Sequence, residues 1–187
     1  MAWTSISEIA TERLHLRPLR PSDEALYCRL YTDPVLMRHI GSPLSELAAK
    51  RAFATACRPA TAAASATLIW SIDRQVAPVG IAACVRTRGI PDEAELGLML
   101  VTEAQGLGFG EEALTALTNQ VFELLHLRRV WTRHAPDNQA SVRLMERMRF
   151  SPGATTADEV QWQMLRSEWQ VPACGWRSWW MPSLPVD

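Results

Sequence analysis

The sequence predicts an α/β protein built around a single mixed β-sheet. Three strand-like segments separated by short turns indicate an antiparallel meander, and they cover residues 67–73, 79–87 and 94–101. A long helical segment follows and leads into a short strand at residues 128–132. Two strands of one sheet that are joined by a crossover helix run parallel. The sheet should therefore contain both antiparallel and parallel pairs.

The N-terminal part is predicted to form one strand and two helices. Apolar and polar side chains alternate over residues 14–19, as in a strand with one buried face. Ser22 is a suitable N-cap for a first helix, in which Leu26 and Leu30 form the inward face. A second helix is predicted at residues 45–56.

The clearest helix covers residues 111–125, where apolar side chains repeat with the 3.6-residue period of an α-helix. The short strand at residues 128–132 comes next, and a further helix is predicted at residues 138–148. A strand at residues 160–165 completes the sheet.

Length and composition indicate one cytoplasmic domain. The 187 residues suffice for a single domain with a substantial core. The net charge of −1 gives no reason to expect binding to nucleic acid or to a membrane. The chain start lacks the features of a secretion signal, and no apolar run reaches the ~20 residues that span a bilayer. We expect reduced thiols and no metal site, because no Cys-x-x-Cys pair occurs among Cys28, Cys57, Cys84 and Cys174.

The C-terminal segment differs from the rest of the chain. We expect a catalytic domain over residues 1–170 and an extension over residues 171–187, with Trp176, Trp179 and Trp180 among prolines. Packing of the extension on its own subunit is favoured. A dimer contact or a wall of the substrate site is the alternative, because exposed tryptophans mark interfaces. Formation of a homodimer is therefore one of the alternatives that the sequence leaves open.

The most informative segment lies between the strand at residues 94–101 and the long helix. Gly106, Gly108 and Gly110 let the backbone turn sharply and approach a ligand closely. The helix that follows offers unpaired N–H groups and a positive dipole end, which suit a phosphate or pyrophosphate. Glu111 follows the last glycine, so the lysine and hydroxyl of a nucleotide triphosphatase loop are absent. The glycine spacing also differs from the dinucleotide fingerprint. A tight turn without a ligand is the alternative.

Several motifs in a fixed order resemble the GCN5-related N-acetyltransferases (GNAT). Residues 105–110 read Gln-x-x-Gly-x-Gly, which is typical of the pyrophosphate loop of that family. Asn138 and Ser141 then open a helix that ends near Phe150, similar to the second signature of the family. The chain also resembles the branch of this family that contains the ribosomal-protein N-terminal acetyltransferases. The similar segments are residues 11–19, 33–41 and 162–169.

The resemblance implies the GNAT fold: a mostly antiparallel sheet of about six to seven strands, about four helices and a splayed central strand pair. It also implies transfer of an acetyl group from acetyl-CoA to a primary amine, on a protein N-terminus or a small molecule. A β-bulge in the fourth strand would open the slot for the cofactor.

The same resemblance assigns residues to acetyl-CoA. Amides of the glycine loop would hold the pyrophosphate, Gln105 would brace the loop, and residues 98–101 would pair with the pantetheine arm. Asn138 would bond to the pantetheine or hold the next loop, or serve as a helix N-cap, and both can be true. The cofactor-binding residues implied in this way are Leu98, Met99, Leu100, Val101, Gln105, Gly106, Leu107, Gly108, Phe109, Gly110 and Asn138.

Acetyl transfer needs a neutral amine, so we expect a general base. Glu95 is the first candidate and Glu93 the second, since side chains two residues apart share one face of a strand. Each could instead be a surface carboxylate. His134 is a weaker candidate, because single histidines are more often structural. Ser141 could donate a proton to the departing thiolate, and the alternative is a solvated serine.

Three features depart from the family pattern. Many relatives use a tyrosine as the proton donor, but Tyr27 and Tyr31 both lie in the first predicted helix. Glu111 stands where Ser or Thr is common and must turn away from a bound pyrophosphate. Arg149 stands where Gly commonly ends the helix in a left-handed turn. A non-catalytic acyl-CoA-binding protein is therefore an alternative function, and a nucleotide-binding α/β protein of another type is a third.

The acceptor amine is not identified by any motif. Glu46, Asp158 and Glu159 could attract a cationic amine. Charges on loops are usually solvated, which is the alternative for all three.

Overall fold

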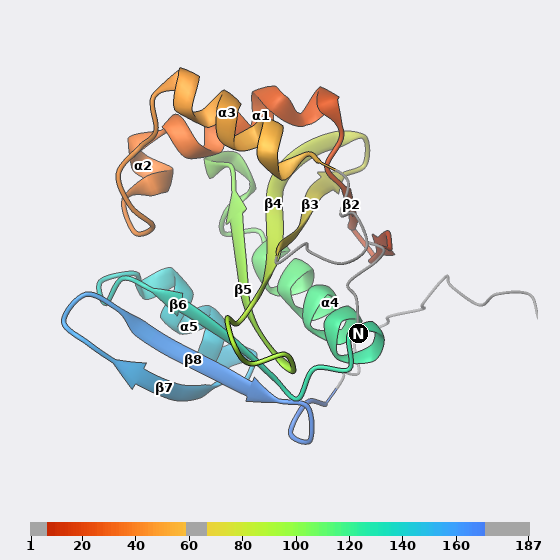
Figure 1. Cartoon of the computed structure of the whole chain (residues 1–187), viewed down its shortest axis with the longest axis vertical. Helices are drawn as coiled ribbons and strands as arrows, with labels where there is room; N and C mark the ends of the chain where they lie inside the picture. Colours follow the sequence, from red (N-terminus) through yellow and green to blue (C-terminus); the bar gives the residue numbers. More distant parts are fainter. Residues whose placement is uncertain (1–6, 59–66, 171–187) are drawn as a thin grey trace, which may run out of the picture.

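The computed structural model describes residues 7–58 and 67–170. They form one sheet in the strand order β1-β2-β3-β4-β5-β6-β8-β7 (Figure 1). The expected extension over residues 171–187 lies outside the described residues, together with Cys174, and it stays a prediction. The strands are β1 (Ile9–Ala10), β2 (Leu14–Pro18), β3 (Thr67–Arg74), β4 (Ala77–Arg86), β5 (Glu93–Leu100), β6 (Arg129–His134), β7 (Ser151–Thr155) and β8 (Val160–Leu165). The helices are α1 (Glu24–Thr32), α2 (Pro34–Met37), α3 (Glu46–Ala56), α4 (Phe109–Leu124) and α5 (Gln139–Arg147), with 3-10 turns η1 (Pro21–Asp23) and η2 (Thr102–Ala104).

The predicted mixed sheet is confirmed. β1 to β5 pair antiparallel in sequence order, β5 and β6 are parallel, and β6, β8 and β7 are antiparallel. The eight strands exceed the expected number because β1 and β7 were not predicted. β1 has only two residues, and β7 contains Pro152 and Gly153, which are depleted in strands. Neither segment shows the alternation that identifies a strand.

The expected splay between β5 and β6 is also present. Backbone pairing joins the two strands over three residues of each and ends at Glu95 and Trp131. Beyond this point β5 stays paired with β4 up to Leu100, and β6 stays paired with β8 up to His134. The two strands diverge because each follows a different neighbour.

The predicted β-bulge in β5 is wrong. The register between β4 and β5 runs without interruption to the pair of Gly80 and Leu100. Register shifts occur instead between Ile72 and Asp73 in the β3–β4 pair, and in the β7–β8 pair. A bulge is unnecessary here because the divergence of β5 and β6 already separates the strands.

The helices pack as their apolar patterns require. Ala113, Leu117 and Val121 of α4 are fully buried, and α4 contacts β2, β4 and β5. Figure 1 shows α1 and α3 side by side, and α1 also contacts β4. Leu26 and Leu30 are buried as predicted. Among the described residues, no helix has the length and apolar character to cross a membrane.

The start of α1 and the residue after α5 differ from what the sequence patterns predict. The predicted cap of the first helix by Ser22 is wrong: α1 begins at Glu24 after η1, and the Asp23 carboxylate accepts a hydrogen bond from the Arg20 amide. The predicted helix at residues 45–56 is α3, and Ser45 caps it by accepting a hydrogen bond from the Ala48 amide. Arg149 adopts the left-handed conformation after α5, with φ +58°, although no glycine is present.

Candidate active site

The splay between β5 and β6 opens into a cleft of about 760 Å³. Its walls come from β4, β5, β6, the first turns of α5 and residues 38–41 after α2. The cleft brings together five of the predicted site residues, which are Glu95, Leu98, Met99, Asn138 and Ser141.

The edge of β5 that faces this cleft is unpaired after Glu95, because β6 has turned away. Leu100 and Val101 are buried, so only their backbone groups could reach a ligand. Such an edge can pair with the amide groups of an extended ligand in the way a further strand would.

The glycine loop lies at the end of β5. Gly106 and Gly108 have φ values of +73° and +81°, a region that favours glycine. The Gln105 side chain donates a hydrogen bond of 3.0 Å to the Leu100 carbonyl, which ties the loop to the end of β5. Among the described residues, no acceptor pairs with the amides of residues 106–111. These free amides at the first turn of α4 provide the donor set that an anionic diphosphate needs.

Both acidic residues that follow the loop point away from it. Glu111 accepts a hydrogen bond of 2.9 Å from Arg147 Nε on α5, so its carboxylate is turned toward α5. Glu112 is buried and bonds to Arg13 and Thr11 near the start of β2. The Glu111 carboxylate is therefore turned away from the loop, as expected from the sequence if a pyrophosphate is to bind there.

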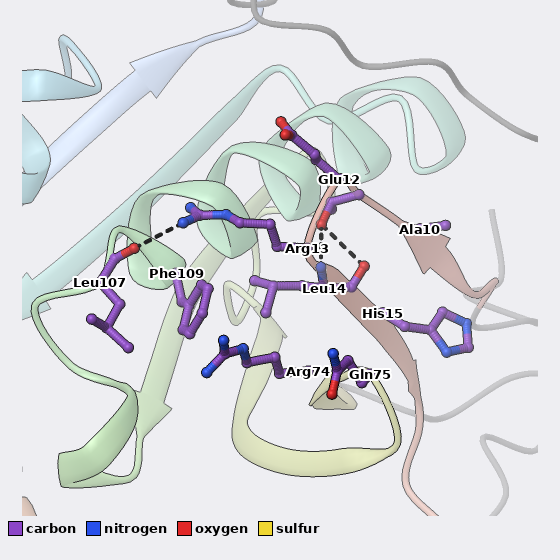
Figure 2. A pocket seen from close by; sticks show the side chains of 10 residues that line it. Ala10, Glu12, Arg13, Leu14, His15, Arg74, Gln75, Leu107 and Phe109 are labelled. Atoms are coloured by element: carbon purple, nitrogen blue, oxygen red, sulfur yellow. Dashed lines mark hydrogen bonds between the residues drawn. The ribbon is translucent and has the colours of Figure 1, made fainter.

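The other side of the loop is held by arginines. Figure 2 shows Arg13 and Arg74 pointing toward the Phe109 ring from opposite sides, with guanidinium carbons at 4.8 and 5.3 Å from the ring centre. Arg13 also donates a hydrogen bond of 3.0 Å to the Leu107 carbonyl. None of these residues lines the cleft, so they support the loop from outside it.

The start of α5 contributes a cap and a free hydroxyl. Asn138 Oδ1 accepts from the Ser141 amide at 3.1 Å, so Asn138 is the N-cap of this helix. The Ser141 hydroxyl makes no hydrogen bond to any described residue, and both residues line the cleft.

Glu95 lines the cleft but is not free. Arg133 Nε donates to it at 2.9 Å, and Nη1 of the same arginine donates to Glu159 at 3.0 Å. To act as a base, Glu95 must therefore either use the oxygen that Arg133 does not contact or be released by a movement of the Arg133 side chain.

The two further base candidates are both engaged by neighbouring groups, although His134 also lines the cleft. Glu93 is buried and ion-paired with Arg128 at 2.7 Å and with Arg129, so it is not a surface carboxylate, and it does not line the cleft. His134 is buried, and Trp162 donates its indole N–H to Nε2 at 2.9 Å. Because Nε2 accepts, Nδ1 carries the proton and donates to the Ala135 carbonyl. Both ring nitrogens are engaged.

Sequence reasoning missed Tyr31, which lines the cleft from α1. Burial raises the pKa of Tyr31, so the phenol keeps its proton at neutral pH. The signal available was its spacing of four residues from the inward-facing Tyr27, whose ring centre lies 4.5 Å away. Arg133 was missed as well, and no local pattern marks it.

Comparison with known proteins assigns the family. A model described as the acetyltransferase (GNAT) domain matches residues 13–151. The chain belongs to the GNAT acetyltransferase family. The protein is thus an acyl-CoA-dependent N-acetyltransferase that uses acetyl-CoA as co-substrate, as the motifs predicted.

Individual relatives of this acetyltransferase are distant. A protein named uncharacterized N-acetyltransferase p20, from Bacillus licheniformis, is 24% identical over 145 residues, which are 75% of this chain and 80% of that protein. A spermidine N-acetyltransferase from Vibrio cholerae, in complex with CoA and spermine, superposes with a TM-score of 0.73 at 18% identity, covering 84% of this chain and 98% of that one. RimL, a ribosomal L7/L12 alpha-N-protein acetyltransferase, in complex with CoA, has a TM-score of 0.70 at 20% identity, with coverages of 85% and 98%. These structural likenesses confirm the GNAT fold.

Proposed function

We propose that this acetyltransferase holds acetyl-CoA along the free edge of β5 and acetylates a primary amine that arrives beside Glu95. The observation that carries the proposal is the early end of the β5–β6 pairing, which leaves an unpaired strand edge directly before a loop of free amides. The acceptor amine is on a small molecule or a peptide.

The residues present fit acetyl-CoA. The amides of residues 106–110 would receive the diphosphate, with Gln105 holding the loop to β5. Backbone groups of residues 98–101 would pair with the pantetheine amides, and Asn138 would lie beside them at the opposite wall. When bound, the thioester supplies the electrophilic acetyl carbon for the amine.

Two proton transfers have candidate groups in the cleft. Glu95 would accept a proton from the incoming ammonium, directly or through one water. Ser141 would donate a proton to the departing sulfur, because its hydroxyl is free and lies one helical turn from Asn138. Tyr31 is a second candidate donor, because it lines the cleft and its phenol is protonated at neutral pH.

Release of free thiol from acetyl-CoA over a panel of peptides and small amines tests this proposal. Glu95→Gln should lower kcat by about a hundredfold or more, because general-base contributions have that size. The matched control is Glu123→Gln, which removes an exposed carboxylate on α4 and should leave kcat unchanged. Calorimetric titration with CoA checks that each variant still binds the co-substrate.

Full turnover by Glu95→Gln, with intact CoA binding, would exclude the base role. If Ser141→Ala and Tyr31→Phe both keep full activity, neither residue is the proton donor. If calorimetric titration of the folded protein with acetyl-CoA detects no binding, the proposed acetyl-CoA site is wrong.

A further inference from the structure

Arg133 occupies a position between two carboxylates at one end of the cleft. It projects from β6, just beyond the point where β5 and β6 separate. Its guanidinium bonds to Glu95 on β5 and to Glu159 before β8, at 2.9 and 3.0 Å. The guanidinium carbon also lies 5.9 Å from the ring centre of Trp131. Arg133, Glu95 and Glu159 all line the cleft.

The ion pairs of Arg133 contribute little to the stability of the folded protein. The Arg133 side chain is 51% exposed, and ion pairs at such positions contribute little to folding because water and salt screen them. The arrangement does, however, decide which charges a ligand meets. The acidic residues that line the cleft are Glu95, Asp158 and Glu159, and Arg133 pairs with two of them.

Asp158 is the carboxylate that remains. Among the described residues, no cation pairs with its side chain. Two other basic side chains on the lining, Arg38 and His39, lie near Asp137 at 3.9 and 3.0 Å. A ligand with one ammonium group would therefore find Asp158 and the second Glu95 oxygen, Oε2, without a cation partner in the described part of the chain, and a second ammonium group would meet Arg133.

Building on the proposed function, we propose that Arg133 determines specificity as a tethered cation, so that the cleft accepts amines with a single positive group and disfavours polyamines. Arg133 fills the place between Glu95 and Glu159 where the second ammonium of a diamine would otherwise bind. A tethered group competes at an effective concentration in the millimolar range or above, so a free diamine does not displace it readily.

The test compares the binding of 1,4-diaminobutane and n-butylamine by calorimetry, with and without CoA. Arg133→Gln should bind the diamine at least about tenfold more tightly than the unmodified protein, because two carboxylates become available to its second ammonium group. Its affinity for n-butylamine should change by less than about threefold. Arg133→Lys keeps a tethered cation and should behave like the unmodified protein. Arg51→Gln removes an exposed arginine of α3 and controls for the change in net charge.

An unchanged diamine affinity in a folded Arg133→Gln variant would overturn this proposal. So would an unmodified protein that already binds the diamine about tenfold more tightly than n-butylamine. Absence of CoA binding would instead contradict the proposed co-substrate site, and the amine titrations without CoA would still decide the role of Arg133.

Discussion

Arg17 carries a charge inside the protein and is held there by two aspartates. Its guanidinium donates to both carboxylate oxygens of Asp23, at 2.8 and 2.9 Å, and to Asp73 at 2.7 Å. All three side chains are buried. The Asp73 carboxylate also accepts from the Ser71 hydroxyl at 2.7 Å. The cluster therefore joins β2, β3 and η1, directly before α1, in the interior.

We expect Arg17→Met to lower the free energy of unfolding by about 3–5 kcal/mol, because two buried carboxylates lose their counter-charge. Arg20→Met is the matched control: this arginine is exposed and pairs with exposed Glu8, so the change should stay below about 1 kcal/mol. Urea denaturation measures both. Equal effects of the two substitutions would show that the buried cluster is not specially important.

The same pair of variants should differ in their response to acid. Burial opposes ionisation of Asp23, but hydrogen bonds from Arg17 and from the Arg20 amide outweigh it and lower the pKa below the ordinary 3.8. Such a carboxyl stabilises the fold above its unfolded pKa, and this contribution is lost as the pH falls through the folded pKa. Unfolding measured between pH 5 and about 2 should show this loss in Arg20→Met and not in Arg17→Met.

At the scale of one element, the glycine loop combines two unusual backbone conformations with fixed neighbours. Gly108 has φ +81°, and a Cβ atom there would lie 3.2 Å from Arg13 Nη2. Arg13 in turn bonds to Glu112 and to the Leu107 carbonyl. A side chain at this position would move the amides that we assign to the diphosphate.

Gly108→Ala should therefore weaken CoA binding by about tenfold or more, the equivalent of one lost charge-assisted hydrogen bond. Gly89→Ala is the matched control, because Gly89 has φ +79° but no atom within 4 Å of an added Cβ. Both substitutions cost about 1–2 kcal/mol of stability from the left-handed conformation. Calorimetry with CoA separates them, and equal affinities in the two variants would remove the loop from the binding site.

At the scale of the whole molecule, the cleft separates two parts that are joined at both of its ends. At one end, β5 and β6 share their short parallel ladder. At the other, His39 Nδ1 lies 3.0 Å from Asp137 Oδ1, and Arg38 lies 3.9 Å from the same carboxylate. Asp137 directly precedes the N-cap of α5, so this contact links the segment after α2 to the wall that carries Asn138 and Ser141.

We expect Asp137→Asn to loosen this end of the cleft without unfolding the protein. Amide hydrogen exchange at residues 35–41 should become several-fold faster, while the free energy of unfolding changes by less than about 1 kcal/mol, because the contact is partly exposed. Glu146→Gln, an exposed change on α5, is the control. Unaltered exchange at residues 35–41 would show that the contact does not hold the two walls together.

The sequence alone identified most elements, because local patterns control them. The predicted helix at 45–56 corresponds to α3 with its Ser45 cap, and the strand at 160–165 matches β8. The glycine motif indicated both the family and a sharp turn, in which Gly106 and Gly108 adopt positive φ. Periodicity, caps and glycine positions are properties of neighbouring residues, so they can be read without the fold.

Only the tertiary structure decided which charged groups are available in the cleft. Glu93 and Glu95 share a strand face, as predicted, yet Glu93 is enclosed by Arg128 and Arg129 whereas Glu95 reaches the cleft. The difference arises because the β5–β6 pairing ends at Glu95, and that end depends on the register of β6 with β8. Long-range strand register has no local signature, and so the sequence named the carboxylates but could not assign their partners.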